Sequence, residues 1–355
     1  MNVRDLLGEV WRNLRTGTTR AALFAVGLGL AIGTLAVADA RGVVDLHRRA
    51  DAFIDSGASV RVVTATDHID GATCEALIGL PAVRASGALA EGARLRLSSM
   101  PDHPVPVFHV TPRMAEVLGV RAEAASGVWV SDHTADLLGV GPGQELRAGG
   151  EPMTVAGVFP YPDDGRDSRL RYAVVVPGGT STGYDECWAD TRPPTEEADD
   201  LLLWAVRAEA DPTVSVNVAQ LNTSLGATFD GAALFAERPT RFALPAAALV
   251  GLVLGFVSVR LRRLEMAGAL HVGVSRRALL VGTVLEAAAW SLAGLALSLC
   301  ALVVAAHVGN PADPWETFAV DVWGPVGAVP AVLAGAVAAV SMIREEHLFR
   351  YFKDR

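Results

Sequence analysis

Three groups of neighbouring carboxylate and imidazole side chains are the residues in this sequence best suited to metal chemistry. They are Asp67-His68-Ile69-Asp70, Asp102-His103 and Asp132-His133. Such side chains could ligate a metal ion if the fold brought them together, but residues that cap turns and helices produce the same pairs. No Ser/His/Asp or Cys/His grouping has a known catalytic signature. We therefore expect no metal site, no catalytic residues and no enzymatic activity in this chain.

The lysine content excludes nucleotide hydrolysis by the chain itself. The P-loop motif GxxxxGK[ST] needs a lysine that reaches the phosphates. The only lysine is Lys353, close to the end of the sequence. The sequence therefore has no Walker A motif, we expect no cofactor in it, and any ATP that it uses must be hydrolysed by a partner.

Glu286 is a carboxylate inside a long apolar run, residues 278–306. It lies about eight residues into the run, roughly 12 Å deep at ~1.5 Å per residue. A carboxylate inside a membrane is costly unless it is paired, protonated or hydrated, which makes it a functional candidate. The alternative, which we favour, is a structural partner for a nearby hydroxyl group or arginine.

The composition indicates a membrane protein, with 51% hydrophobic and 19% charged residues. Four apolar runs hold the surplus, and Glu286 is the only charged residue in them: residues 21–38, 242–259, 278–306 and 322–342. The shortest runs have 18 residues. A helix of that length spans about 27 Å, close to the ~30 Å hydrocarbon core of a bilayer. We predict four transmembrane helices.

The first run has one rival interpretation. Ala36-Val37-Ala38 resembles the cleavage site of a signal peptide. However, the preceding segment is long and contains Asp5 and Glu9. A retained helix is the better interpretation.

Arginines around the runs predict the orientation. They are concentrated in three segments, residues 1–20, 260–277 and 343–355, whereas residues 307–321 contain acidic residues and no Lys or Arg. Short loops rich in arginine stay on the cytoplasmic side. We therefore expect a protein of the bacterial cell membrane with both termini in the cytoplasm.

The region between the first two runs, residues 39–241, must then lie outside. It has 29 acidic residues against 17 arginines, so nothing indicates a nucleic-acid partner. We expect a mixed α+β domain with a helical stalk at residues 42–56. The predicted strands are residues 59–64, 105–110, 128–131, 153–159, 172–176 and 201–208; the predicted helices are 71–80, 131–138 and 214–226; and residues 178–200 are a predicted loop.

Two further features concern packing. Cys74 and Cys187 in the outer region could be bridged or could be two buried thiols, and both remain open. The motifs Gly29xxxGly33 and Gly251xxxGly255 let helices approach closely, as in a packed bundle or a dimer.

Taken together, the sequence resembles the FtsX-like/MacB-like permeases of the type VII ABC transporter superfamily. The order of one span, a large outer domain and three spans is the first match. The arginine-rich segment before a Gly-rich first span is the second. The third is the loop after the second span, where Glu265-Met266-Ala267 and Gly273-Val274-Ser275-Arg276-Arg277 are similar to the family's Glu-Ile-Gly and Gly-Ala-Ser-Arg-Arg.

The resemblance implies a permease subunit that couples a separate ATPase to the outer domain by mechanotransmission, for export or extraction of an amphiphile such as an antibiotic, peptide or lipid. The expected partners are an ABC ATPase dimer carrying ATP and Mg, a second permease copy or paralogue, and the bilayer. The expected ATPase contacts are Leu7, Trp11, Leu14, Glu265, Gly273, Ser275, Arg276 and Arg277.

Two alternatives share this architecture. One is a non-transporting regulator of a cell-wall hydrolase, and the other is a sensory subunit for cell-wall-active peptides.

Overall fold

The chain forms two compact units in the computed structural model, which describes residues 3–124, 126–149, 151–179, 183–192, 196–207 and 214–344. One unit consists of Met1–Arg49 and Gly231–Arg355 and is called the membrane unit below; Ala50–Asp230 is the sheet unit. Most of the expected tail, residues 343–355, lies outside the described residues, as does Lys353.

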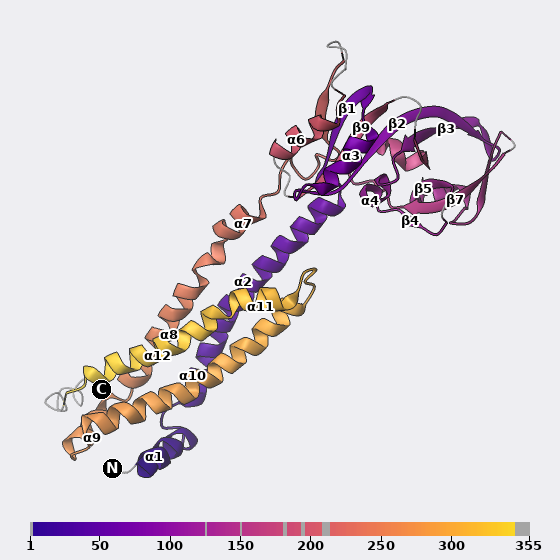
Figure 1. The fold of residues 1–355 in the computed structure, drawn as a ribbon. Coiled ribbons are helices and arrows are strands. Elements are labelled where there is room, and N and C mark those ends of the chain that lie inside the picture. The colour runs from indigo at the N-terminus through magenta and orange to yellow at the C-terminus, as the bar shows by residue number, and fades with distance from the viewer. Residues whose placement is uncertain are drawn as a thin grey trace. The chain divides into compact units, whose positions relative to one another are not determined.

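Four helices of the described chain are long and apolar enough to cross a membrane. They are α2 (Ala21–Asp55), α8 (Ala243–Arg260), α10 (Arg276–His307) and α12 (Trp323–Ser341) (Figure 1). Helices α2 and α10 contain the first and third predicted runs, and α8 and α12 match the second and fourth to within one residue at each end. The shorter helices α1 (Val3–Arg15), α7 (Gly231–Glu237), α9 (Arg263–His271) and α11 (Pro314–Asp321) complete the membrane unit. The predicted fold class, four membrane helices with an α+β domain inserted after the first, is confirmed.

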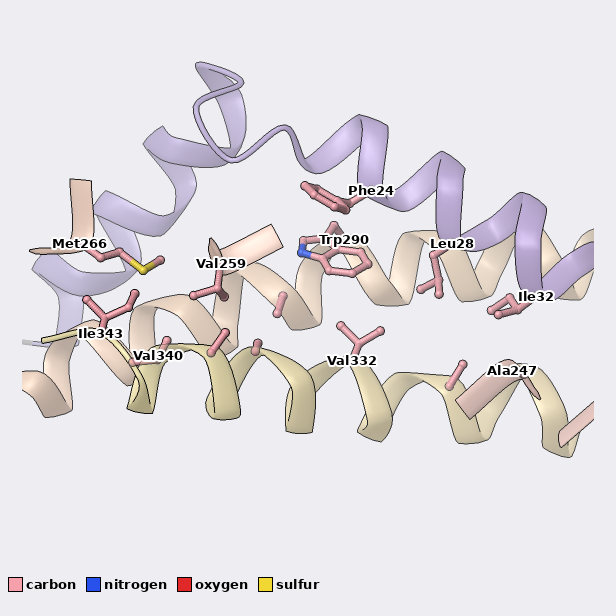
Figure 2. Packing of buried hydrophobic residues seen from close by; sticks show 14 of the residues in the cluster. Phe24, Leu28, Ile32, Ala247, Val259, Met266, Trp290, Val332, Val340 and Ile343 are labelled. Atoms are coloured by element: carbon pink, nitrogen blue, oxygen red, sulfur yellow. The ribbon is translucent and has the colours of Figure 1, made fainter. Parts of the chain in front are cut away.

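The four long helices share one apolar core. Phe24 and Leu28 of α2 pack toward Trp290 of α10, with the Phe24 and Trp290 ring centroids 5.5 Å apart (Figure 2). Val332 of α12 is fully buried in the same cluster. This core fixes how the helices of the membrane unit face one another.

Glycines bring α8 and α12 into backbone contact. A methyl group added at Gly255 would collide with the carbonyl oxygen of Val332, and one at Gly335 would collide with that of Leu252. Such approaches gain van der Waals contact between helices, which is a main attractive force in a membrane.

The sheet unit is built on a mixed sheet whose strands run in the order β10-β1-β9-β2-β3-β8-β5-β7-β4, with β6 pairing β2 and β7. The strands are β1 (Val60–Ile69), β2 (Val83–Leu97), β3 (Met100–Val110), β4 (Arg121–Ala122), β5 (Val128–Ser131), β6 (Glu145–Ala148), β7 (Glu151–Phe159), β8 (Val174–Pro177), β9 (Tyr184–Thr191) and β10 (Asn217–Gln220). The short helices are α3 (Gly71–Ala76), α4 (Met114–Leu118), α5 (Asp132–Leu138) and α6 (Glu196–Leu202).

The strand pairings close a ring. From β2 they pass through β3, β8, β5, β7 and β6 and return to β2, where Leu97 pairs with Ala148. Val130, Val155 and Val174 are fully buried in one apolar cluster of this ring. A closed ring has no free edge, and the long strand β2 joins the ring to the rest of the sheet because it also pairs with β9.

Much of the predicted secondary structure of this unit is confirmed. Asp70 caps α3 by accepting from the Thr73 backbone nitrogen at 2.7 Å. Ser131 caps α5, which ends at Gly139 with a φ of 65°. The strands predicted at 59–64, 105–110, 128–131, 153–159 and 172–176 overlap β1, β3, β5, β7 and β8.

Three predictions were wrong. The loop predicted at residues 178–200 contains β9, a central strand between β1 and β2. The strand predicted at 201–208 is the end of α6 followed by a 3₁₀ turn, Leu203–Ala205, because a short apolar run does not distinguish a strand from a buried helix. The helix predicted at 214–226 contains β10, and the valines at alternate positions 214, 216 and 218 lead into it with the two-residue period of a strand.

The acidic residues of β9 hid this strand, and each is paired. Glu186 accepts from both terminal nitrogens of Arg169, at 2.7 and 2.6 Å, and from the indole of Trp188 at 2.7 Å. Asp190 accepts from Ser59 at 2.6 Å and from Arg192 at 2.8 Å. Charges with such partners can be buried in a central strand.

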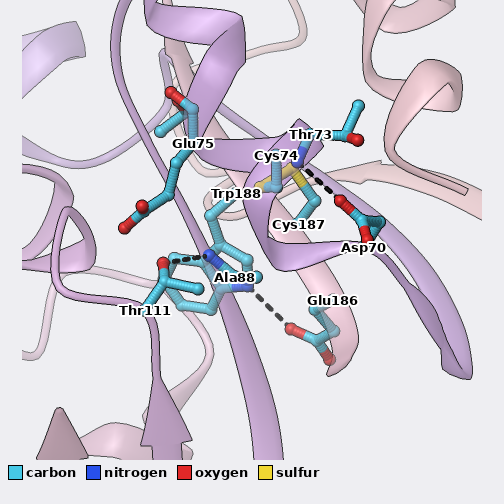
Figure 3. The surroundings of a disulfide bond; sticks show 10 residues. Asp70, Thr73, Cys74, Glu75, Ala88, Thr111, Glu186, Cys187 and Trp188 are labelled. Carbon is cyan, nitrogen blue, oxygen red and sulfur yellow. Dashed lines mark hydrogen bonds between the residues drawn. A yellow bond between two sulfur atoms is a disulfide. The ribbon is translucent and has the colours of Figure 1, made fainter. Parts of the chain in front are cut away.

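A disulfide joins the same strand to α3. Cys74 and Cys187 are bonded, and both are fully buried (Figure 3). The bridge links positions separated by 113 residues, so it restricts the unfolded chain strongly.

We expect the variant Cys74→Ala/Cys187→Ala to lose about 2–4 kcal/mol of stability in the sheet unit, because the unfolded chain regains its freedom. Thermal unfolding of the full chain, with and without reductant, measures the effect. Cys300→Ser, at the exposed free cysteine of α10, is the control and leaves unfolding unchanged. An equal melting temperature for wild type and the double variant would contradict the prediction.

We expect Gly255→Ala to destabilise the membrane unit by about 1–3 kcal/mol, because the methyl group forces α8 away from α12. Gly327→Ala in α12 is the matched control, since nothing lies within 4 Å of the added methyl group. It should keep or slightly raise stability through its better helix propensity. Thermal unfolding in detergent compares the two, and equal effects would argue against the close contact.

Candidate functional site

The loop between α8 and α10 folds into the short helix α9 and a tight turn. Arg262 stands immediately before α9. Gly273 has a φ of 94°, a conformation that favours glycine. Ser275 then caps α10 by accepting from the Ala278 backbone nitrogen at 3.3 Å. The turn therefore presents residues 272–277 at the end of the bundle.

Glu286 of α10 is paired at this end of the bundle. Its side chain accepts from Arg262 Nη1 at 2.6 Å and from Asn13 Nδ2 of α1 at 2.8 Å. Arg262 also donates through Nε to Glu265 at 3.0 Å. One carboxylate thus holds α1, the start of α9 and α10 together.

Electrostatics favours the charged state of this cluster. Burial disfavours a charged guanidinium, but attraction to Glu286 and hydrogen bonds to Glu286 and Glu265 raise the pKa of Arg262 above its ordinary value. Glu286 is 7% exposed, so its hydrogen bonds to Arg262 and Asn13 take the place of water. This geometry agrees with the structural interpretation of Glu286.

A cleft of about 260 Å³ lies beside the cluster. Its walls include Glu9 and Asn13 of α1, Arg262, Glu265 of α9, and Thr283 and Glu286 of α10. The cleft belongs to the membrane unit alone, and its polar floor is made of the residues that tie the three helices together.

The predicted ATPase contacts fall into two groups. Exposed ones are Leu7 (50%) and Trp11 (62%) on α1, Glu265 on α9, and the consecutive arginines Arg276 and Arg277. Gly273 and Ser275, which shape the turn, are exposed as well, and Leu14 is half-buried. Sequence reasoning missed Asn13 as a partner of Glu286 and Val272, which is 84% exposed.

A signal for one missed contact was present in the sequence. A carboxylate in an apolar run needs a partner, and Arg262 is in the loop that precedes its helix. The separation of 24 residues follows no helical period, so the pairing itself could not be read from spacing.

The other candidate residues lie elsewhere in the structure. Gly29 and Gly33 of α2 face α10, where an added methyl group at Gly29 would lie 2.7 Å from Leu297, and Gly251 faces Ala328 of α12. Asp132 accepts from the backbone nitrogens of His133 and Tyr161. Within the described ranges, no group of three or more His, Cys, Asp or Glu side chains is placed to hold a metal ion.

We expect Arg262→Gln to lower the stability of the membrane unit by about 3–5 kcal/mol, because it leaves the Glu286 carboxylate buried without its counter-charge. Glu265→Gln is the control. It removes the exposed partner of the same arginine and should cost no more than about 0.5 kcal/mol. Thermal unfolding in detergent measures both.

The double variant Arg262→Gln/Glu286→Gln removes both charges and should recover part of the loss. If the loss of stability in the double variant equals the sum of the losses in Arg262→Gln and Glu286→Gln, the two side chains are not directly paired.

Comparisons with known proteins place the chain in a family. The family model described as the MacB-like periplasmic core domain matches residues 23–223, more than half of the chain. No curated protein sequence matches significantly.

Two solved structures are similar in part. The periplasmic region of MacB from Actinobacillus actinomycetemcomitans is 8% identical, with 46% of this chain and 89% of that chain covered and a TM-score of 0.33. The extracellular domain of the noncanonic ABC-type transporter YknZ from Gram-positive bacteria is 16% identical, with 44% and 99% covered and a TM-score of 0.31. The assignment rests on the family model, and by that match the chain belongs to the MacB-like family of ABC transporter permeases.

Proposed function

We propose that this permease receives mechanical work from a separate ABC ATPase at the turn between α9 and α10 and transmits it to the sheet unit, to export or extract an amphiphilic substrate. The observation that carries the proposal is the Glu286 cluster. Arg262, three helices and the exposed turn move as one body as long as the carboxylate stays paired.

The exposed surface of this body suits a protein partner. Trp11 and Val272 are exposed apolar side chains, and Arg276 and Arg277 are exposed cations beside Val272. Aromatic residues and arginines are enriched where proteins bind one another. The partner would be an ATPase dimer that carries the ATP and Mg, and the permease would act with a second copy or a paralogue.

Transmission to the sheet unit needs a stiff connection, and α2 supplies one. This helix has 35 residues without interruption, from Ala21 in the membrane unit to Asp55 in the sheet unit. At ~1.5 Å per residue it is about 52 Å long. In this proposal both termini lie in the cytoplasm of a bacterium and the sheet unit lies outside the cell membrane.

A cleft of about 820 Å³ in the sheet unit supports an amphiphilic substrate. Its lining combines the apolar surfaces of Leu118 and Trp188 with the charges of Arg84, Glu116 and Arg192. A ligand with an apolar body and charged groups could satisfy both kinds of surface.

We expect the variant Arg276→Glu/Arg277→Glu to weaken binding to the ATPase on the order of tenfold or more, because reversing two interface charges replaces attraction by repulsion. Co-purification with the ATPase and ATP hydrolysis by the complex measure the effect.

The matched control is Arg94→Glu/Arg96→Glu, which reverses two exposed charges of β2 and should leave the complex intact. If the complex and its activity survive reversal at Arg276 and Arg277, this turn is not the contact. If no ATPase co-purifies with the wild-type chain, the transport proposal itself fails.

A further inference from the structure

Asp321 is a buried carboxylate at the opposite end of the bundle from Glu286. It is the last residue of α11 and is 4% exposed. Neither of its oxygens accepts a hydrogen bond from any residue that the structure describes. A buried charge without partners is costly. The burial of Glu286 is explained by its partners, whereas the burial of Asp321 is not.

The neighbouring charges are already matched with one another. Asp39 of α2 accepts from Arg238 at 2.8 Å and from the Thr240 hydroxyl at 2.5 Å. Arg238 also donates to the Phe235 carbonyl oxygen at 2.8 Å and lies over the ring of that residue. Its single charge therefore balances Asp39.

Asp321 faces Asp39, a group of the same charge. The remaining cation nearby is Arg241, which is exposed. Its guanidinium lies over the Phe242 ring, 4.7 Å from the centroid, and donates to the Ala236 carbonyl oxygen at 3.4 Å. Asp321 therefore has no ion-pair partner among the described residues, and it can share a hydrogen bond with Asp39 only if one of the two carboxyl groups holds a proton.

A pocket of about 250 Å³ opens onto this charge. Asp39, Arg238, Arg241 and Asp321 form its polar part, and the apolar side chains of Ile32, Leu35 and Ala247 form its walls. Leu244 and Trp323, both more than half exposed, stand at its rim. The walls and the rim belong to α2, α8 and α12 of the membrane unit, and the rim is apolar, as expected for a pocket that opens to lipid.

The lining selects the chemistry of a ligand. Hard metal ions need six or more oxygen ligands, and here there are two carboxyl groups and two guanidinium groups. A primary ammonium group needs fewer oxygen ligands, since it is a compact charge with three hydrogen-bond donors. A hydrocarbon chain attached to it would lie against the apolar walls.

We propose that this pocket binds the ammonium group of a cationic amphiphile, with Asp321 as its counter-ion. The inference rests on the proposed function where it identifies the ligand as cargo, because an amine lipid of the bilayer has the same chemistry. Binding to the permease alone, without ATPase or ATP, tests the site separately from transport.

The probe is a long-chain primary amine that carries a photoreactive diazirine, added to the full chain in phosphatidylcholine nanodiscs. We expect saturable labelling of the pocket walls, mapped by mass spectrometry, that excess dodecylamine prevents and dodecyl sulfate does not. Asp321→Asn should reduce labelling about tenfold, the loss of one ion pair of ~1.4 kcal/mol. Asp321→Glu, which keeps the charge, should retain labelling.

The matched control is Glu316→Gln, which removes an exposed carboxylate of the same helix and should leave labelling unchanged. Adding phosphatidylethanolamine to the nanodiscs distinguishes the two sources of the ligand. If this lipid prevents labelling, the pocket binds a lipid head group. If labelling persists, the pocket binds another amphiphile. Equal labelling of wild type and Asp321→Asn would overturn the proposal. So would equal protection of the wild type by dodecyl sulfate, which decides the matter even if the asparagine variant fails to fold.

Discussion

The cost of a charge in an apolar environment determines how one end of the membrane unit is built. The buried Glu286 carboxylate has Arg262 and Asn13 within hydrogen-bonding distance, and losing them would leave it without partners in an apolar environment. That requirement fixes α10 against the start of α9 and against α1, whose own length is too short for it to hold its place as an isolated helix. A force applied to the turn after α9 must therefore either move α10 as well or separate Arg262 from Glu286, which costs free energy.

Backbone packing sets what else can move. Gly251, Gly255 and Gly335 bring α8 and α12 so close that one helix cannot slide past the other without a collision. On the other side, Gly29 and Gly33 seat α2 against α10, and the Phe24 and Trp290 rings fill the space beside them. Packed interfaces of this kind have discrete arrangements and do not deform continuously. If the helices of the membrane unit move, we therefore expect them to move in pairs as rigid bodies.

The sequence was sufficient for features that depend on composition and local chemistry. Apolar runs identified the four long helices, and Asp70, Ser131 and Gly139 identified helix ends because capping is local. It was insufficient where distant residues change the meaning of a segment. Glu186 and Asp190 made β9 look like a loop, since Arg169 and Ser59, which pair with them, are distant in the sequence. In the same way, Glu286 was recognised as needing a partner. Its pairing with Arg262 could not be predicted, because the two residues are separated by a helix and a turn and their spacing follows no helical repeat.

The two buried carboxylates of the membrane unit therefore carry different information. Glu286 has a full set of partners within the chain, so its burial is explained by structure alone. Asp321 is equally buried and has none among the described residues, while the nearest arginine is already committed to Asp39. A buried carboxylate without hydrogen-bond partners, such as Asp321, does not stabilise the fold. Such a group must either take up a proton, as it can beside Asp39, or meet a cation from outside the chain. The asymmetry between the two ends therefore distinguishes a carboxylate that holds the helices together from one that is available to the proposed ligand.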